Sequence, residues 1–390
     1  MQAPYLFNTL AVHAGSPIDP STGAVIEPIS LSTTFAQKSV GKPVGEFEYS
    51  RLSNPNRANF ETAVASLEQG RYALAFASGT AVTATILQGL AAGGHVISVA
   101  DVYGGTHRYL TQVAKALNIT VTFTSSIESE LGQLINNMTR VIWIESPSNP
   151  TLQLVDIRAV ADVAHKHNVV VVVDNTFLSP YIQKPLDHGA DISVNSVSKY
   201  LGGHSDVIMG VAAFNSDDLQ QRLSFLQNAI GAVPSAFDSW LAHRGLKTLH
   251  LRVRQASCNA AAIADTLVAS PHVVCVNYPG LDSHAQRNVA QVQHREGLGG
   301  GMLSFRICGG QAAAERFCTA VKLFTLATSL GGVESFVELP SLMTHACIPR
   351  SEREAVGILD DLIRVSCGVE DVDDLKADIL QALEVAIAEK

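Results

Sequence analysis

The sequence predicts an α/β protein with two domains: a large one built on a mostly parallel sheet and a smaller α+β one at the C-terminal end. A chain of 390 residues exceeds what a single hydrophobic core usually organises. Short runs rich in Val and Ile alternate with helical stretches up to about residue 225, which is typical of a parallel sheet covered on both faces. We expect an N-terminal arm over residues 1–59, a large domain over 60–250 and a small domain over 251–390.

The arm is predicted because Pro, Ser and Thr recur in it and neither helical nor strand periodicity is sustained. After it come runs with the length and the β-branched content of buried strands. They are residues 73–76, 95–99, 120–124, 141–145, 169–174, 192–195 and 207–211. In open α/β sheets ligands gather beyond the carboxyl ends of the strands, so the residues that follow these runs are the candidates for a site.

The small domain is predicted from a change in this pattern. Residues 236–269 are expected to form one long helical stretch that leads into it. Beyond that stretch, strand-like runs at residues 273–276 and 302–307 mix with amphipathic helices at 311–321 and 371–387.

Composition and charge exclude several classes of partner. The formal net charge is −9, and Lys and Arg are scattered singly, so the chain lacks the basic footprint of a nucleic-acid or anionic-membrane binder. Hydrophobic residues make up 47% and charged residues 16%, a balance that leaves apolar surface for a partner subunit to cover. No secretion signal or membrane span is visible.

The cysteines form no CxxC pair, and we expect them to be reduced thiols in the core of a cytoplasmic protein, with no metal site. They are Cys258, Cys275, Cys308, Cys318, Cys347 and Cys367.

Two polar residues that follow neighbouring strands together indicate a chemistry. Asp174 ends the run 169–174, and Lys199 ends the segment Ser-Val-Ser-Lys after the run 192–195. Taken alone, Asp174 suits a helix cap or a turn, and Lys199 suits a solvated surface position. Together they match pyridoxal 5'-phosphate, which forms an imine with a lysine and needs a carboxylate to keep its ring nitrogen protonated.

Hydroxyl groups and a helix start suit the phosphate of such a cofactor. Ser196 and Ser198 precede Lys199, and Gly79 and Thr80 stand where a strand runs into a helix. Backbone N–H groups at a helix start receive an anion against the positive end of the helix dipole. A Ser-Gly-Thr turn is also an ordinary helix cap, so this pattern is weak by itself.

Tyr103 and Asn149 follow two further predicted strands. Tyr103 has a flat face that can stack on a heteroaromatic ring, and Asn149 has an amide that can donate a hydrogen bond to a phenolate oxygen. Rim packing explains a single tyrosine equally well, and a turn explains the asparagine.

Four motifs give the chain an end-to-end resemblance to the Cys/Met metabolism family of pyridoxal-phosphate enzymes, and most closely to its γ-lyase branch of fungal type. The motifs are Tyr-Ser-Arg-Leu-Ser-Asn-Pro at 49–55, Asp-Asn-Thr at 174–176, Ser-Val-Ser-Lys-Tyr at 196–200 and Ser-Leu-Gly-Gly-Val-Glu-Ser at 329–335. The resemblance implies the fold type I architecture of PLP-dependent transferases and pyridoxal 5'-phosphate as the cofactor.

The resemblance also assigns roles at the cofactor. It implies that Lys199 binds the cofactor covalently, that Asp174 pairs with the ring nitrogen and that Tyr103 stacks on the ring. The remaining implied cofactor residues are Gly79, Thr80, Asn149, Thr176, Ser196 and Ser198, with Tyr49 and Arg51 reaching the phosphate of a neighbouring subunit. A homotetramer made of two dimers, with active sites shared between subunits, is therefore implied.

An activity follows from the same resemblance. The γ-lyase branch eliminates the γ-substituent of L-cystathionine and releases L-cysteine, 2-oxobutyrate and ammonia, with Lys199 and Tyr103 implied for the proton transfers. Arg364 maps to the arginine for the substrate carboxylate. Glu48 and Glu334 map to acids that face the distal ammonium, although both are otherwise ordinary exposed carboxylates. The implied substrate site is completed by Tyr103, Asn149 and Ser329.

Related enzymes with the same cofactor residues carry out γ-synthesis, β-elimination or methionine cleavage, so these residues do not choose the reaction. Gly105 stands where methionine-cleaving relatives are expected to have Cys, which counts against that branch. A cystathionine γ-synthase or β-lyase is the nearest alternative. A non-catalytic scaffold that has retained the fold is an alternative of a different class.

Overall fold

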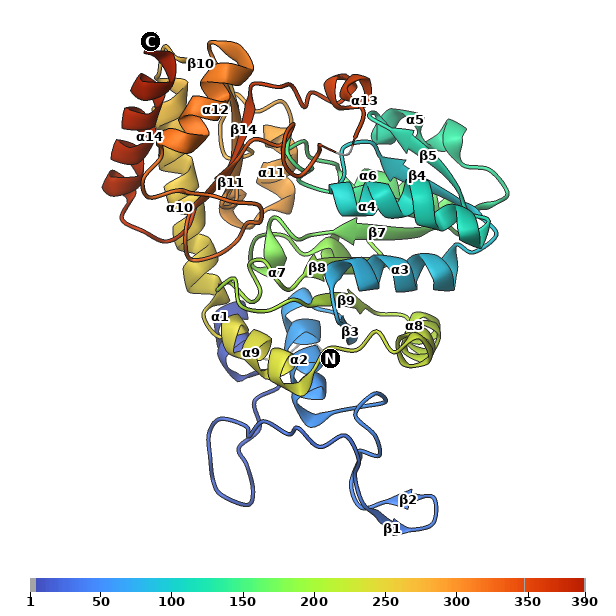
Figure 1. Ribbon diagram of the computed structural model, residues 1–390. Helices are drawn as coiled ribbons and strands as arrows, with labels where there is room; N and C mark the ends of the chain where they lie inside the picture. The colour runs from blue at the N-terminus through green and yellow to red at the C-terminus, as the bar shows by residue number, and fades with distance from the viewer. Residues whose placement is uncertain (1–4, 347, 389–390) are drawn as a thin grey trace.

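The computed structural model describes residues 5–346 and 348–388, and its large domain is built on a seven-stranded sheet (Figure 1). The strand order is β3-β9-β8-β7-β6-β4-β5, and every neighbouring pair is parallel except the two that involve β9. The strands are β3 Tyr72–Phe76, β4 His95–Val99, β5 Thr120–Thr124, β6 Thr139–Glu145, β7 Val170–Asp174, β8 Ile192–Ser196 and β9 Gly210–Phe214. The predicted mostly parallel sheet is confirmed.

One strand was predicted in the wrong place, because β9 covers Gly210–Phe214 rather than residues 207–211. Val207 and Ile208 are apolar and β-branched like strand residues, but they line the cavity described below. Pairing begins at Gly210, which lies opposite both Phe76 and Ser196 in the register of the neighbouring strands.

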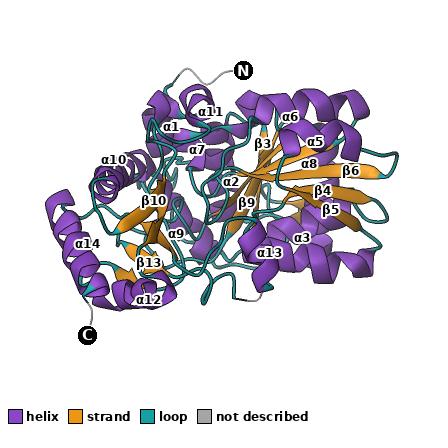
Figure 2. Cartoon of the chain, turned by 90° about the horizontal axis from the view of Figure 1, so that it is seen from above, coloured by secondary structure: helices purple, strands orange, loops and turns teal. Residues whose placement is uncertain are grey.

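Helices cover both faces of this sheet (Figure 2). Several begin at capping residues that satisfy free N–H groups of the first turn: Ser78 caps α3, Asp156 caps α6 and Ser216 caps α8. The helices are α3 Gly79–Leu90, α4 Gly104–Arg108, α5 Ile127–Leu134, α6 Ile157–Ala164, α7 Ser179–Ile182 and α8 Asp217–Ile230. Their apolar faces and the Val and Ile side chains of the strands form one continuous core.

The small domain has a second, five-stranded sheet in the order β10-β11-β14-β13-β12, with one parallel pair, β12 and β13. The strands are β10 Val273–Asn277, β11 Met302–Ile307, β12 Thr325–Leu326, β13 Phe336–Glu338 and β14 Leu362–Ser366. The helices are α10 Leu249–Val268, α11 Arg287–Gln293, α12 Gly310–Ala320, α13 Arg350–Ala355 and α14 Val372–Ile387. Helices α10, α12 and α14 enclose this domain's core with the sheet.

The predicted helical stretch over residues 236–269 is divided into two helices, α9 Ala236–Leu246 and α10 Leu249–Val268. At the break, Arg252 donates hydrogen bonds of 2.8 Å both to the carbonyl oxygen of Gly245 and to that of Tyr200. The arginine thus satisfies carbonyl groups outside the helical ladder, a tertiary interaction that periodicity does not reveal.

The N-terminal segment projects from the body of the molecule as an extended arm (Figure 1). It contains a short hairpin of β1 Gln37–Ser39 and β2 Lys42–Pro43. In contrast to the prediction of an arm without regular structure, Phe7–His13 forms helix α1, which packs on α2. Helix α2 covers Pro55–Glu68 and begins inside the predicted arm, at an Asn54 cap followed by Pro55.

The five described cysteines are free thiols, but they are not all in the core. Cys318 and Cys367 are buried, whereas Cys258 and Cys275 are exposed, which corrects the prediction for these two. Cys347 lies outside the described residues. No described helix combines the length and the hydropathy needed to cross a membrane.

Strand β9 passes directly under the start of helix α3. A Cβ atom added to Gly210 would lie 2.5 Å from the carbonyl oxygen of Ser78 and 2.7 Å from the Cα of Gly79. Real Cβ atoms do not approach backbone this closely, so a side chain at Gly210 would displace the turn that starts the helix.

We therefore expect Gly210→Ala to lower the free energy of unfolding by about 1–3 kcal/mol, the usual cost of forcing a methyl group into a packed site. Gly132→Ala is the control, since Gly132 is exposed in α5 with nothing within 4 Å of an added Cβ. It should raise stability by up to about 1 kcal/mol, because Ala favours a helix interior over Gly. Thermal melting of both variants measures the difference, and equal melting temperatures would contradict the expectation.

Candidate functional site

A cavity of roughly 600 Å³ lies beyond the carboxyl ends of β6, β7 and β8, where the small domain meets the large one. Most of the residues predicted from the sequence line it. They are Gly79, Thr80, Tyr103, Asn149, Asp174, Thr176, Ser196, Ser198, Lys199, Ser329 and Arg364. Residues far apart in the chain thus converge on one space of the size that binds a small molecule.

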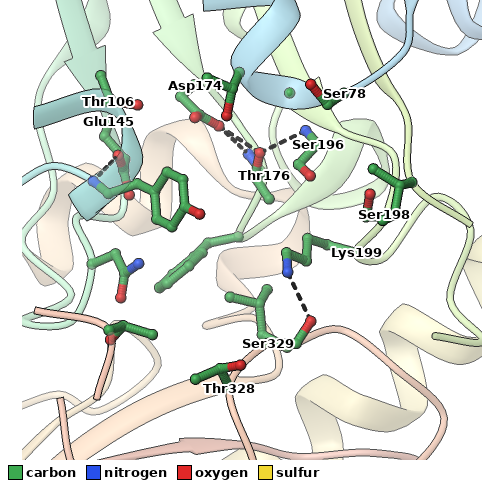
Figure 3. Close-up of a pocket in the computed structure, with 18 of the residues that line it drawn as sticks. Ser78, Thr106, Glu145, Asp174, Thr176, Ser196, Ser198, Lys199, Thr328 and Ser329 are labelled. Carbon is green, nitrogen blue, oxygen red and sulfur yellow. Dashed lines mark hydrogen bonds between the residues drawn. The ribbon is translucent and has the colours of Figure 1, made fainter. Parts of the chain in front are cut away.

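Lys199 points into this cavity and toward Ser329 of the small domain (Figure 3). Its Nζ donates a hydrogen bond of 2.7 Å to the Ser329 Oγ. Burial and the positive charge of Arg364 lower the pKa of Lys199 to about 8, against the opposing effect of Glu338. An amine with this pKa is partly neutral near physiological pH, so it can act as a nucleophile toward a carbonyl carbon and as a base.

Asp174 ends β7, the neighbour of β8 in the large sheet, and is oriented by Thr176 (Figure 3). Its Oδ1 accepts hydrogen bonds from the backbone N–H of Thr176 at 3.0 Å and from the Thr176 hydroxyl at 2.5 Å. Burial raises the pKa of Asp174, and the two hydrogen bonds from Thr176 oppose that rise. A cation placed beside this carboxylate would stabilise its charged form, as the protonated nitrogen of a heteroaromatic ring would do.

A second carboxylate, Glu145, lies beside Asp174 because these residues pair in register across β6 and β7. It is 4% exposed, and its Oε2 accepts a hydrogen bond of 2.7 Å from the backbone N–H of Tyr103. Burial and then the charge of Asp174 raise the pKa of Glu145 well above its ordinary value. Glu145 fixes the backbone that carries the half-exposed Tyr103 ring.

The start of helix α3 forms a cradle for an anion. The Ser78 hydroxyl accepts a hydrogen bond of 3.1 Å from the N–H of Ala81, while the N–H groups of Gly79 and Thr80 have no acceptor among the described residues. A Cβ atom at Gly79 would lie 3.3 Å from the Cβ of Ser196 and 3.4 Å from its Oγ, and would narrow the space there. The free N–H groups and the nearby hydroxyls suit a phosphate.

Arg364 is the cation of the small-domain wall, and it is 3% exposed. Its Nη1 donates to the Asn149 Oδ1 at 2.9 Å and lies 3.0 Å from the Glu338 Oε1, and its Nη2 donates to the Ser329 carbonyl oxygen at 2.8 Å. Because the Asn149 Oδ1 faces Arg364, the amide nitrogen of Asn149 is the end left to donate to a ligand.

These groups fit pyridoxal 5'-phosphate, the cofactor expected from the sequence. The helix start offers donors for its phosphate, Asp174 offers a carboxylate for its ring nitrogen, and Lys199 offers an amine for its aldehyde. The cavity therefore offers a partner for the phosphate, the ring nitrogen and the aldehyde of the cofactor.

Four predicted site residues do not line this cavity: Glu48, Tyr49, Arg51 and Glu334. All four are exposed, and the first three belong to the projecting arm. Arg51 instead donates a hydrogen bond of 3.1 Å to the Oδ1 of Asn228. The roles of these residues remain predictions, since they require a second subunit or a bound substrate.

Sequence reasoning missed other residues of the site. Glu145 ends a predicted strand and could have been found by the rule that singled out Asp174. Glu338, Thr344 and His345 form a hydrogen-bonded network beside Arg364, in which Thr344 also lines the cavity, and no motif or periodicity marks them. Apolar wall residues such as Phe177 were also not predicted.

Comparison with known proteins agrees with this geometry. A family model described as "Cys/Met metabolism PLP-dependent enzyme" matches residues 8–384. The chain is 58% identical over 385 residues to the cystathionine gamma-lyase of Saccharomyces cerevisiae, which covers 97% of this chain and 98% of that protein. It is 52% identical over 381 residues to the cystathionine gamma-lyase of Dictyostelium discoideum, and the match covers 97% of this chain and 98% of that protein.

The fold is also similar to that of solved structures. The crystal structure of cystathionine gamma-lyase from yeast superposes with a TM-score of 0.96 at 57% sequence identity, and covers 100% of both chains. That of cystathionine gamma-lyase from Lactobacillus plantarum, complexed with L-serine, superposes with a TM-score of 0.95 at 41% identity, covering 99% of this chain and 100% of that chain.

The environment of Lys199 predicts its reactivity. In cofactor-free protein, we expect acetylation of Lys199 by acetic anhydride to increase with pH around a midpoint near the pKa of about 8. Arg364→Leu should move this midpoint upward by about one pH unit, because it removes a nearby positive charge. Peptide mass spectrometry measures the modified fraction at each pH. If the midpoint is the same in both proteins, the charge of Arg364 does not lower the pKa of Lys199.

Proposed function

Since the chain belongs to the Cys/Met metabolism family of PLP-dependent enzymes, we propose that it uses pyridoxal 5'-phosphate to cleave L-cystathionine by γ-elimination. The products are L-cysteine, 2-oxobutyrate and ammonia. One observation carries this conclusion: the chain is 58% identical, over 97% of its length, to a cystathionine gamma-lyase. The enzyme is accordingly a carbon–sulfur lyase of amino-acid metabolism in transsulfuration, the route by which cystathionine yields cysteine.

When bound, pyridoxal phosphate withdraws electrons from the amino acid, so that protons at Cα and Cβ become acidic and the Cγ–S bond can break. In this proposal Lys199 would hold the cofactor covalently, and its free amine would remove the Cα proton of the substrate. Its lowered pKa, to about 8, makes it a base matched to physiological pH.

Asp174 is proposed to hold the proton of the ring nitrogen. The hydrogen bonds from Thr176 keep the carboxylate aimed in one direction, so no reorientation is needed during the reaction. Burial strengthens the interaction between this carboxylate and a ring cation, since little water competes for either charge.

Tyr103 is proposed to stack on the cofactor ring and, with Lys199, to move the later protons. Its ring is 46% exposed on the cavity wall, and its backbone is held by Glu145. A phenol in this position can donate a proton to the departing thiolate of cysteine. Lys199 is proposed to transfer the Cα and Cβ protons.

Arg364 is proposed to bind the substrate carboxylate, with Asn149 and Ser329 beside it. A guanidinium binds a carboxylate by two parallel hydrogen bonds, which fixes both the position and the rotation of the substrate. At the distal end, Glu48 and Glu334 are proposed to recognise the second ammonium group of cystathionine.

The proposed assembly is a dimer of dimers whose active sites are shared between subunits. The arm supports this proposal because it projects from the body and leaves apolar side chains exposed. These exposed side chains include Val25, Leu31, Val40, Val44 and Leu52. Tyr49 and Arg51 on this arm would reach the phosphate of the neighbouring subunit.

A cytoplasmic location is also proposed, and the free thiols of the five described cysteines support it.

The reaction is tested by incubating purified holoenzyme with L-cystathionine and identifying the products. We expect cysteine and 2-oxobutyrate as products. Homocysteine with pyruvate would instead indicate a β-lyase, and net formation of cystathionine would indicate a γ-synthase.

Asp174→Ala should reduce turnover by at least about a thousandfold while cofactor still binds, because the ring nitrogen loses its counter-charge. Near-normal turnover in this variant would refute the role of Asp174.

Shared active sites predict complementation between two inactive variants, Lys199→Ala and Arg51→Ala. If the arm serves the neighbouring site, half of the randomly paired dimers are hybrids with one intact site of two, so activity should recover to about a quarter of wild type. Co-expression with two different tags gives the hybrid for assay. No recovery in a purified hybrid would show that each site is built within one chain.

A further inference from the structure

A buried glutamate stands directly behind the proposed carboxylate-binding arginine. Glu338 ends strand β13, pairs in register with Arg364 of β14 and is 1% exposed. Its Oε1 lies 3.0 Å from the Arg364 Nη1. Glu338 does not line the cavity itself, so it acts on a bound carboxylate through the guanidinium of Arg364.

The contacts of Arg364 leave one edge of its guanidinium for a ligand. An arginine has five N–H donors. The Asn149 Oδ1 accepts from Nη1 and the Ser329 carbonyl oxygen accepts from Nη2, while the Glu338 carboxylate forms an ion pair with Nη1. Within residues 5–346 and 348–388 no acceptor is found for Nε or for the second Nη2 donor of Arg364.

The corresponding edge of another arginine in this protein binds a carboxylate. Arg306 donates from Nε to the Asp361 Oδ1 at 2.8 Å and from Nη2 to the Asp361 Oδ2 at 2.9 Å. Nε and Nη2 thus form a fork that matches two carboxylate oxygens. In Arg364, Nε and one N–H of Nη2 are without an acceptor among the described residues, so the same two atoms can meet a carboxylate.

Glu338 is itself held by a relay of hydrogen bonds that returns to Asn149. The Thr344 hydroxyl donates to the Glu338 Oε1 at 2.6 Å and lies 2.9 Å from the Nδ1 of His345. The Nε2 of His345 lies 3.1 Å from the carbonyl oxygen of Asn149. Since the Asn149 side chain also contacts Arg364, the five residues close a ring that joins the two domains.

We propose that Glu338 is a positioning residue for substrate recognition: through this ring it holds Arg364 so that the Nε and Nη2 edge meets the α-carboxylate of an amino acid. This inference rests on the proposed function, in which Arg364 binds that carboxylate. Thr344 and His345 fix the orientation of Glu338, and Asn149 links the ring to the cofactor side of the cavity.

Glutamine is the substitution that can keep the contacts of Glu338. The Glu338 Oε1 accepts a hydrogen bond from the Thr344 hydroxyl and lies 3.0 Å from the Arg364 Nη1. The side-chain carbonyl oxygen of a glutamine can accept at the same position. Glu338→Gln should therefore preserve the ring.

The test compares a ligand that has an α-carboxylate with one that lacks it. Glycine and methylamine both react through an amine with the bound cofactor, and its absorbance change reports the dissociation constant of each. Glu338→Ala should raise the dissociation constant of glycine by about tenfold, a typical effect of misplacing a positioning group. The dissociation constant of methylamine should not change. Glu338→Gln should restore glycine binding to within about threefold of wild type.

Thr344→Val serves as the variant of nearly unchanged shape. It breaks the relay at one hydroxyl, and glycine should bind about fivefold more weakly, the worth of one hydrogen bond. Glu370→Ala is the matched control, because Glu370 accepts hydrogen bonds from Ser335 in the same domain and has no hydrogen bond to Arg364 or Asn149. It should leave the ratio of the two dissociation constants unchanged.

The proposal is overturned if Glu338→Ala and Thr344→Val keep the wild-type ratio of glycine to methylamine binding, or if both ligands weaken equally. It is also overturned if Glu338→Gln binds glycine no better than Glu338→Ala. Neither ligand requires cleavage of cystathionine. A failure of the proposed reaction would therefore appear in the product assay while this binding comparison still decides the role of Glu338.

Discussion

Compensation of charge inside one cavity is the constraint on which the rest of the site depends. Lys199 and Arg364 carry positive charge in the same cavity, and Asp174 and Glu145 are adjacent carboxylates. Burial favours the neutral form of an amine and of a carboxyl, by lowering the pKa of the amine and raising that of the carboxyl. The pKa directions of Glu145, Asp174 and Lys199 follow this rule. A ligand with a phosphate, a ring cation and a carboxylate would bring partners of opposite charge to this cavity.

The sheet topology places these groups together. Because β6, β7 and β8 are adjacent and parallel, their carboxyl ends carry Glu145, Asp174 and Ser196 to the same edge. The antiparallel β9 then returns under the Lys199 loop, where the backbone N–H of Met209 donates to the Ser198 hydroxyl at 3.1 Å. The opposite wall comes from the second sheet, and Arg364 connects the walls by its hydrogen bond to Asn149. Neither domain alone contains the cavity.

Sequence patterns located most of this fold because buried parallel strands are continuous apolar runs with few alternatives. The errors occurred where tertiary contacts override local pattern. Val207 and Ile208 have strand-forming side chains but face a cavity, so the predicted strand began before Gly210. The break between α9 and α10 depends on Arg252, whose hydrogen bonds to two carbonyl groups are not encoded in periodicity. Helix α1 was missed because its seven residues are too few to show a sustained repeat, although Phe7 and Ala11 are buried in the core.

The site was predictable where chemistry and position agreed, as for Lys199 and Asp174 at strand ends. Glu338 was not predictable, because a glutamate has no local signal that distinguishes a paired, buried position from an exposed one. Glu338 ends a strand of three residues, too short to show alternation, and its burial depends on a pairing with Arg364 that only the folded sheet creates. A group that orients a binding residue from behind makes no contact with the ligand, so motifs defined by ligand chemistry do not include it. Such residues become visible only when the partners of each binding group are counted donor by donor.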